Sequence, residues 1–386
     1  MTEQRRIIII GGGIAGLSAA QAARQQDPQA HIFLVCGESV LPYYRTRIPE
    51  LINGADPEKL NLRSYQWYID NNIQVVRSKA TAVVSDNRQV RFSDGSYLYY
   101  DSLVIASGAS GLIPETAYAQ LPGVGPLRDR EDVARIQAHR GSAVVLGDGL
   151  LALEIAWQLS RSGRDVTIVG RERRLLHKQL DQEASGFLLR VIELLGLHIA
   201  LRGELAALED GRAYLADGRA FEAATVVFAT GIRSNVKMGQ SAGVAINRGI
   251  LVDEQMQTSL PQIWAAGDCA EFQGEIPGMW TVAMAQGTVA GINAAGGKKL
   301  YQPETPLYTM QAMGVELFSY GDISSQDCFS LVDSYRPSFG KLFFQQDTLA
   351  GLEAIGTELP FLQLRKAVEQ RLPRREALAL LKETLA

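Results

Sequence analysis

The sequence predicts an α/β protein with two similar strand–turn–helix–strand units and a smaller α+β region at the C-terminal end. Two glycine-rich turns support this. The first, GGGIAG at residues 11–16, follows the apolar run 5–10, and the second, GDGLLA at 147–152, follows the apolar run 142–146. An Ala- and Leu-rich helical pattern comes directly after each turn, and a further apolar run closes each unit.

The first unit contains a strand, the glycine turn, a helix from Leu17 to about Gln26 and a second strand at residues 32–35. Residues 41–55 have the composition of a loop, with Pro42 and Pro49 among them. Short strands are then expected, ending in a buried run, at residues 73–76, 80–85, 89–93, 97–100 and 103–106.

Prolines and glycines between residues 111 and 127 indicate a linker. The second unit follows, and its expected strands and helix lie at residues 143–146, 150–162, 165–169 and 225–231. Residues 263–296 give a strand, a Gly-Asp turn and a long helix. From about residue 303 the pattern changes to short strands and two C-terminal helices, with Pro373 at the start of the last one.

Composition narrows the class of protein. The chain has 386 residues, 46% hydrophobic and 21% charged, with a formal net charge of −4, which gives no reason to expect nucleic-acid binding. No apolar run approaches the roughly 20 residues that span a bilayer, and no signal-peptide pattern precedes the first strand, so the cytoplasm is the expected location and no membrane partner is expected. The three cysteines and four histidines are scattered, so neither a disulfide framework nor a bound metal is expected.

The G-x-G-x-x-G spacing has a chemical reason. The first glycine permits a tight turn, the second lets the backbone approach a pyrophosphate, and the third position lets helix and strand pack closely. The helix N-terminus then offers N–H donors and a positive dipole end to the phosphates. Ala152 in the third position of the second turn is an accepted variant.

Further motifs make the chain resemble the FAD- and NAD(P)-dependent pyridine nucleotide oxidoreductases, which have two dinucleotide-binding domains. These are IASGA at 105–109, ATGIRSN at 229–235 and IWAAGDCAE at 263–271. The resemblance covers residues 5 to about 300. It implies a Rossmann-like FAD domain at 1–113 and 246–304, a Rossmann-like NAD(P)H domain at 114–245 and a C-terminal domain at 305–386.

Within this family the absence of cysteine between Cys36 and Cys269 is informative. Disulfide reductases carry a cysteine pair near the flavin, and peroxide- or oxygen-reducing members carry one redox cysteine there. The chain, with its Leu41–Arg45 loop, is instead similar to rubredoxin and flavorubredoxin reductases. The resemblance thus implies electron transfer from NAD(P)H through FAD to a small iron-containing carrier, rubredoxin or ferredoxin, without a thiol relay. A ferredoxin reductase, the electron-donating component of a nitrite reductase, an NAD(P)H oxidase and a flavin-based redox sensor remain as alternatives.

The resemblance also implies the site residues. Arg45 and Glu154 are expected at the reacting centre, in positioning roles, since hydride transfer needs no acid or base. The residues expected to bind the cofactors are Gly11, Gly13, Ile14, Ala15, Gly16, Glu38, Arg45, Ala106, Ser107, Gly108, Gly147, Gly149, Leu150, Leu151, Glu154, Arg171, Arg173, Arg174, Thr230, Gly231, Gly267, Asp268 and Trp280.

Several of these residues have a plainer interpretation as well. Glu38 is expected at the adenosine ribose of FAD, or else as a solvated loop acid. Glu154 is expected where nicotinamide meets flavin, or else as an exposed helix residue. Asp268 is expected at the ribityl and pyrophosphate region of FAD. Trp280 either shields the flavin ring or is a core aromatic.

Two questions of charge stay open. The arginines in Arg171–Arg174 can clamp a 2′-phosphate, whereas Glu172 can bind free ribose hydroxyls, so NADH and NADPH are both possible. Basic residues concentrate in the last two helices as either a solvated face or a docking surface for an acidic electron carrier. They are Arg365, Lys366, Arg371, Arg374, Arg375 and Lys382.

Overall fold

The structure is a computed structural model that describes residues 4–114, 118–276, 278–333 and 338–385. The chain divides into two compact units. The first contains residues 1–48, 55–111 and 231–304, and the second contains residues 49–54, 112–230 and 305–386. Part of the expected linker, residues 115–117, lies outside the described residues.

The core of the first unit is a parallel sheet in the order β19-β7-β1-β2-β3. Its strands are β1 (Arg6–Ile10), β2 (His31–Cys36), β3 (Ile73–Arg77), β7 (Ser102–Ile105) and β19 (Ile263–Ala265). The central strand β1 contains four consecutive isoleucines, 0 to 6% exposed. A run of β-branched residues buried on both faces is typical of a central parallel strand covered by helices.

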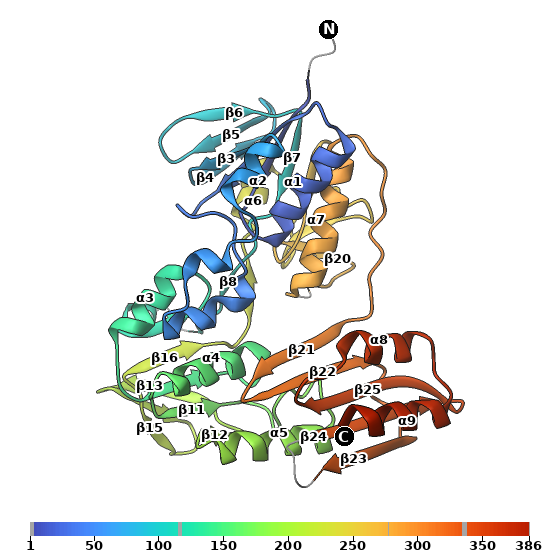
Figure 1. The fold of residues 1–386 in the computed structure, drawn as a ribbon. Coiled ribbons are helices and arrows are strands. Elements are labelled where there is room, and N and C mark those ends of the chain that lie inside the picture. Colours follow the sequence, from blue (N-terminus) through green and yellow to red (C-terminus); the bar gives the residue numbers. More distant parts are fainter. Residues whose placement is uncertain (1–3, 115–117, 277, 334–337, 386) are drawn as a thin grey trace. The chain divides into compact units, whose positions relative to one another are not determined.

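Two helices, α1 (Ile14–Gln26) and α7 (Trp280–Ala294), lie side by side in this unit although they are far apart in the sequence (Figure 1). Glycines on α7 permit the contact. A Cβ added to Gly287 would lie 2.2 Å from the carbonyl oxygen of Ala15, and one added to Gly291 would lie 2.1 Å from that of Ala19. The helix backbones therefore approach closely, and residues 287–291 of α7 pack against residues 15–19 in the first half of α1.

Smaller elements complete the first unit. An antiparallel sheet has the order β4-β5-β6, β8 pairs with β17 antiparallel, and β18 pairs with β20 parallel. The elements are β4 (Ala80–Val84), β5 (Gln89–Phe92), β6 (Tyr97–Tyr99), β8 (Ala109–Gly111), β17 (Ile232–Ser234), β18 (Ile250–Val252), β20 (Ala270–Phe272), α2 (Tyr65–Asp70) and α6 (Lys237–Ala242).

The second unit contains another parallel sheet, in the order β12-β11-β10-β16-β9, and a small antiparallel sheet, β13-β14-β15. The strands are β9 (Val124–Pro126), β10 (Ala143–Leu146), β11 (Val166–Val169), β12 (His198–Ala200), β13 (Leu205–Glu209), β14 (Arg212–Leu215), β15 (Ala220–Glu222) and β16 (Thr225–Phe228). The helices are α3 (Arg130–Ala138), α4 (Leu150–Arg161) and α5 (Gln182–Leu194).

The C-terminal part of the second unit is an antiparallel sheet in the order β21-β22-β25-β24-β23. Its elements are β21 (Leu307–Ala312), β22 (Val315–Gly321), β23 (Cys328–Asp333), β24 (Ser338–Gln345), β25 (Thr348–Gly356), α8 (Phe361–Glu369) and α9 (Arg374–Leu385). Strand β24 is buried on both faces. Leu342 and Phe344 pack with α8 and α9, whereas Phe339 on the other face meets Phe187 of α5 with ring centroids 5.6 Å apart. Helix α5 therefore joins the C-terminal sheet to the parallel sheet of the same unit, which it contacts at β12.

The predicted fold class is confirmed: two parallel α/β sheets, each with a glycine turn after one strand, and an α+β C-terminal region. The first helix begins at Ile14, earlier than the expected Leu17, because the glycine turn feeds straight into it. The expected loop at 41–55 contains a 3₁₀ helix, Arg45–Asn53, and a second one follows at Pro57–Leu60. Helices α2, α3, α5 and α6 were not anticipated. In the part of the chain that the structure describes, no helix is long and apolar enough to cross a membrane.

Candidate nucleotide-binding sites

The first glycine turn has the geometry that the sequence predicts. Gly11 has φ +125°, and a Cβ there would lie 2.0 Å from the carbonyl oxygen of Ala106, so only glycine fits. Gly16 is equally confined, since its Cβ would lie 1.9 Å from the carbonyl oxygen of Gly11. Gly13 is different: it is the N-cap of α1, no side chain caps it, and a Cβ there would have nothing within 4 Å. The turn thus leaves space, with Ile14 and Ala15 in the first helical turn, where N–H donors can meet an anionic group.

The Gly-Asp turn lies at the same helix end. A Cβ added to Gly267 would lie 2.9 Å from the Cβ of Ala15, and the Gly267 N–H donates to Oε1 of buried Gln286 at 2.9 Å. The hydroxyl of Ser234 donates to the backbone oxygen of Asp268 at 2.6 Å. The structure therefore brings the Gly267–Asp268 turn next to the first glycine turn, although the two are far apart in the sequence.

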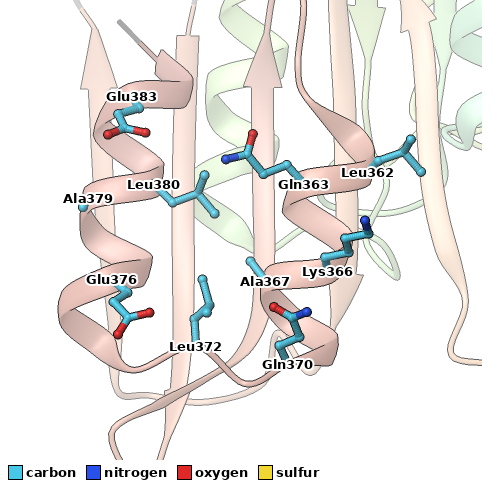
Figure 2. A pocket seen from close by; sticks show the side chains of 10 residues that line it. All are labelled: Leu362, Gln363, Lys366, Ala367, Gln370, Leu372, Glu376, Ala379, Leu380 and Glu383. Atoms are coloured by element: carbon cyan, nitrogen blue, oxygen red, sulfur yellow. The ribbon is translucent and has the colours of Figure 1, made fainter.

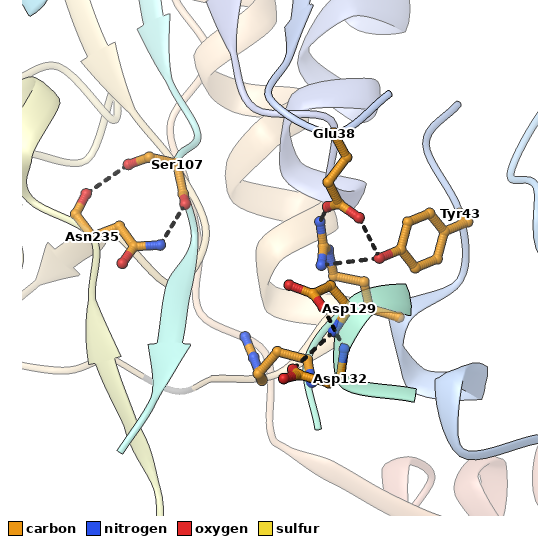
Figure 3. A network of polar contacts seen from close by, with 8 residues as sticks. Glu38, Tyr43, Ser107, Asp129, Asp132 and Asn235 are labelled. Atoms are coloured by element: carbon orange, nitrogen blue, oxygen red, sulfur yellow. Dashed lines mark hydrogen bonds and ion pairs between the residues drawn. The ribbon is translucent and has the colours of Figure 1, made fainter. Parts of the chain in front are cut away.

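The end of β7 is tied to a distant segment of the same unit. The Ser107 hydroxyl donates to the carbonyl oxygen of Asn235 at 2.7 Å, and Nδ2 of Asn235 donates back to the carbonyl oxygen of Ser107 at 3.0 Å (Figure 3). The N–H of Asn235 donates to the carbonyl oxygen of Gly108 at 2.9 Å. Ser107, expected to bind the cofactor, thus uses its hydroxyl in this reciprocal link, which holds the carboxyl edge of the sheet.

Glu38 and Arg45 form an ion pair with each other. Tyr43 completes the cluster: its hydroxyl donates to Oε2 of Glu38 at 2.7 Å, and Arg45 donates to the same hydroxyl at 3.3 Å (Figure 3). The Arg45 guanidinium lies 5.0 Å from the centroid of the Tyr43 ring. From the sequence, Glu38 is expected at the adenosine ribose of FAD and Arg45 at the reacting centre, and the structure places their side chains in contact.

Trp280, the first residue of α7, stacks on Tyr44, with ring centroids 5.5 Å apart and planes 21° apart. The indole is partly buried against the core of the first unit. Since Tyr44 precedes Arg45 in the sequence and Trp280 begins α7, the ring contact joins the loop that carries Arg45 to the N-terminal end of α7.

The second glycine turn repeats the first. Gly147 has φ +139°, and a Cβ there would lie 2.5 Å from the carbonyl oxygen of Ala229. Gly149 is the N-cap of α4, with no side-chain cap and nothing within 4 Å of an added Cβ. Leu150 and Leu151 form the first turn of α4. By contrast, Ser64, Asp129 and Asp181 cap helices α2, α3 and α5 with side-chain oxygens.

Glu154 lies one turn further along α4, between the buried residues Leu153 and Ile155. Burial raises the pKa of Glu154 to about 7, and the negative charge of Glu50 acts in the same direction. No hydrogen bond or ion pair reaches the Glu154 carboxyl group from the residues that the structure describes. A partly buried carboxyl group that titrates near neutrality is typical of a functional position.

Residues 171–174, which follow β11 and are expected to meet the ribose end of the dinucleotide, are mostly exposed. Arg171, Glu172 and Arg173 are exposed, whereas Arg174 turns back and donates to the carbonyl oxygen of His177 at 2.7 Å. After β16, the Thr230 hydroxyl donates to the carbonyl oxygen of Leu112 at 3.1 Å. Gly231 belongs to the other unit and has φ +124°.

All three cysteines are free. Cys36 is 3% exposed, and burial raises the pKa of its thiol to about 12. Cys269 is fully buried, burial likewise raises the pKa of its thiol, and its Sγ donates to the carbonyl oxygen of Ile105 at 3.3 Å. Both buried thiols are therefore protonated near neutral pH, and a protonated thiol is a poor nucleophile.

The basic residues of α8 and α9 are partly neutralised. Arg365 pairs with Glu369 at 2.7 Å. Arg374 pairs with Asp347 at 2.6 Å and with Asp327, and its guanidinium lies 3.9 Å from the centroid of the Phe344 ring. A groove between the two helices has apolar residues such as Leu372 and Leu380 along its floor, with Lys366, Glu376 and Glu383 beside them (Figure 2). Arg374 thus anchors α9 to the sheet, and the surface carries charge of both signs.

Some contributing residues were not anticipated. Tyr43 and Asn235 hold predicted site residues in place, and Gln286 holds the Gly-Asp turn. Glu50 acts on Glu154 through its charge. A buried amide such as Gln286 inside an apolar helix is a usable signal, because a buried polar group needs a partner. Asn235 and Glu50 carry no local signal, since the residues they act on lie in distant parts of the sequence.

Comparison with known proteins matches residues 5–287 to the family described as pyridine nucleotide-disulphide oxidoreductase. The NADH-rubredoxin oxidoreductase of Clostridium acetobutylicum is 31% identical over 328 residues, which are 84% of this chain and 83% of the relative. The assimilatory nitrate reductase electron transfer subunit of Bacillus subtilis is 29% identical over 92% of this chain, which spans 48% of that relative.

Solved structures agree with the sequence relatives. The crystal structure of the NADH:rubredoxin oxidoreductase from Clostridium acetobutylicum matches with a TM-score of 0.77 and 28% identity, covering 96% of both chains. That of the covalent putidaredoxin reductase–putidaredoxin complex matches with a TM-score of 0.85 and 25% identity, over 98% of this chain and 99% of the other. The family model covers well over half of the chain, and the geometry of both glycine turns fits it. This chain is therefore a member of the pyridine nucleotide-disulphide oxidoreductase family.

Proposed function

We propose that this protein is an FAD-dependent NAD(P)H oxidoreductase that passes electrons through flavin to a small iron-containing carrier. Rubredoxin is the first candidate for this carrier, and the transfer uses no redox-active disulfide. The observation that carries the proposal is the pair of glycine turns with the same geometry in one chain, at Gly11–Gly16 and at Gly147–Ala152. Each follows a central parallel strand and opens a helix without a side-chain cap, which is the arrangement that binds a dinucleotide pyrophosphate.

The relatives support the electron carrier. One is named for NADH and rubredoxin, and one neighbouring structure holds a reductase joined to putidaredoxin. The states of the buried thiols agree, because Cys36 and Cys269 are both held protonated and cannot serve as a thiolate relay. Cys328 lies apart from the glycine turns in sequence, on strand β23 of the C-terminal sheet.

In this proposal FAD occupies the first turn and the nicotinamide dinucleotide the second. The domains are 1–113 with 246–304 for FAD, 114–245 for NAD(P)H, and 305–386. When bound, FAD supplies the conversion of a two-electron hydride donor into single electrons. Gly13 leaves space for the FAD pyrophosphate, and Asp268 lies beside the same helix end. Gly149 leaves the same space for the nicotinamide dinucleotide, and Glu154 follows on the same helix, α4. Arg45 and Glu154 position the reacting groups.

A matched pair of variants tests the two turns. Gly13→Ala and Gly149→Ala each add one methyl group where nothing lies within 4 Å, so both variants should fold. Gly13→Ala should lose FAD on purification, whereas Gly149→Ala should keep its yellow colour and raise the Kd for the nicotinamide dinucleotide. Wild-type protein that takes up no FAD would refute the proposal, and so would two variants with identical cofactor content and dinucleotide affinity.

The carrier is tested by steady-state reduction of rubredoxin, ferredoxin, oxygen and ferricyanide, with NADH and NADPH compared. Rubredoxin should be reduced faster than oxygen, and oxygen as the fastest acceptor would favour the oxidase alternative. Slow reduction of every acceptor, with a long-lived reduced state, would favour a redox sensor. The cytoplasm is proposed as the location, in keeping with the supply of NAD(P)H there.

A further inference from the structure

The two glycine turns differ in charge at their middle residue. In the first turn this residue is Gly12, and a Cβ there would lie 2.7 Å from Sγ of Cys36, the last residue of β2. In the second turn it is Asp148. Both middle residues therefore face the carboxyl end of the neighbouring parallel strand, but only the second brings a carboxylate there.

Contacts fix the place of the Asp148 carboxylate. Its Oδ2 accepts the backbone N–H of Glu172 at 3.1 Å, and the Asp148 carbonyl oxygen accepts the N–H of Leu176 at 2.9 Å. A Cβ added to Gly170 would lie 2.8 Å from the Cβ of Asp148 and 3.0 Å from its Oδ2. The carboxylate thus lies against residues 170–172, directly after β11.

This is the place where charge decides between two dinucleotides. In such a unit the adenosine ribose binds at the end of the second strand, where a carboxylate accepts from the 2′-hydroxyl and an arginine accommodates a 2′-phosphate. Arg174 donates to the carbonyl oxygen of His177, so its guanidinium is engaged within the protein and is not directed at a 2′-phosphate. Arg171, Glu172 and Arg173 are exposed on the same segment and complete the set of charges there.

We propose that Asp148 is a specificity-determining residue, which disfavours a 2′-phosphorylated dinucleotide and favours one with a free 2′-hydroxyl. This rests on the proposed function, because it requires the dinucleotide at the second turn. A carboxylate held against the ribose end repels a 2′-phosphate through like charge, and it offers an acceptor to a hydroxyl. The exposed arginines reduce this repulsion, whereas hydrogen bonds to the segment after β11 hold Asp148, within the turn itself, in a fixed position.

Asp148 also has a structural role, because it holds the segment 170–176 to the glycine turn, and the variants must separate the two roles. Asp148→Asn removes the charge but keeps a side-chain oxygen that can accept the N–H of Glu172. Asp148→Gly removes both and reproduces the Gly-Gly-Gly of the first turn, so it serves if the asparagine variant fails to fold. Asp165→Asn is the matched control: Asp165 immediately precedes β11, so the same charge is lost at the opposite end of the strand.

The test uses the FAD-loaded protein and two probes that cannot be reduced, adenosine 2′,5′-bisphosphate and adenosine 5′-monophosphate. Their Kd values are measured by calorimetry, and kcat/KM is measured with NADPH and NADH. Asp148→Asn should tighten the bisphosphate at least about tenfold, which is about 1.4 kcal/mol, relative to the monophosphate. Asp165→Asn should leave the ratio of the two Kd values unchanged.

Three outcomes would overturn the proposal. The ratio could stay constant in Asp148→Asn and Asp148→Gly, it could change equally in Asp165→Asn, or Glu172→Gln alone could carry the whole change. If neither probe binds the wild-type holoprotein, the dinucleotide site at the second turn is wrong, and the proposed function fails together with this inference. A ratio that changes only in the Asp148 variants supports it.

Discussion

Glu353 offers a direct test of how a buried acid affects stability. It lies on β25, is 0% exposed, and faces Lys341 on β24. Its Oε1 accepts the N–H of Asp181 at 2.7 Å, and its Oε2 has no hydrogen-bond partner among the described residues. Lys341 is bound instead to Asp181 at 2.7 Å and to Glu183 at 2.8 Å. Burial, with the negative charge of Asp181, raises the pKa of Glu353 from 4.5 to about 8.

The sign of the pH effect follows from proton binding. Between the unfolded pKa of 4.5 and the folded value of about 8, the folded state binds the proton more tightly, so the free energy of unfolding falls as pH rises. Glu353→Gln removes the titration and keeps an oxygen that can accept the N–H of Asp181. Since one pKa unit corresponds to about 1.4 kcal/mol, the wild type should lose up to about 3 kcal/mol relative to the variant between about pH 5 and about pH 8.

Urea denaturation at several pH values, with FAD at the same saturation in both proteins, measures this difference. Glu376→Gln, an exposed glutamate on α9, controls for the substitution and should keep the wild-type slope. A difference between wild type and Glu353→Gln that stays constant over this pH range would refute the reasoning. So would a difference that changes in the opposite direction.

Three further predictions follow from other sites. Burial and the charge of Glu50 raise the pKa of Glu154 to about 7, so the KM for NADH should rise above neutral pH, where a carboxylate forms near an anionic ligand. Glu154→Gln should abolish this inflection in the pH profile of KM. An inflection that persists in the variant would contradict a role of Glu154 in dinucleotide binding. Gly11→Ala should lower the urea midpoint far more than Gly54→Ala, because both glycines have positive φ but only at Gly11 would the added Cβ lie 2.0 Å from a carbonyl oxygen. Equal decreases of the midpoint in the two variants would show that backbone strain alone sets the cost. Arg374→Met should lower the urea midpoint more than Arg371→Met, since Arg374 holds two ion pairs and a ring contact while Arg371 is exposed, and the reverse order would contradict an anchoring role.

The parts of the fold that the sequence predicts best are those with local causes. The glycine turns, the isoleucine strand β1 and the start of α7 at Trp280 follow from the spacing of glycines and apolar residues within a short window. Helix α3 was missed, since its sequence is mostly polar and its start depends on a capping box between Asp129 and Asp132. Helix α5 was missed as well, and its apolar face is buried partly against the distant strand β24.

Side-chain partners could not be predicted in the same way. Glu38 and Arg45 are seven residues apart in the sequence, yet their ion pair depends on how the chain folds back after β2. The charge of Arg374 is visible in the sequence, but its two acidic partners lie in other segments, Asp327 just before β23 and Asp347 in the turn between β24 and β25. A docking surface inferred from a count of basic residues therefore changes once the structure shows which of them are already paired.

The repetition of one backbone design explains how a single chain can hold two different nucleotides. Both turns confine their first glycine against a carbonyl oxygen and leave the N-cap glycine open, so both fit a pyrophosphate equally well. Discrimination must then come from the side chains at the ribose end. In the first unit Glu38, the acid expected from the sequence at the ribose, is paired with Arg45 and Tyr43. In the second, Oδ2 of Asp148 accepts the backbone N–H of Glu172, and in our proposal its charge acts on the ligand.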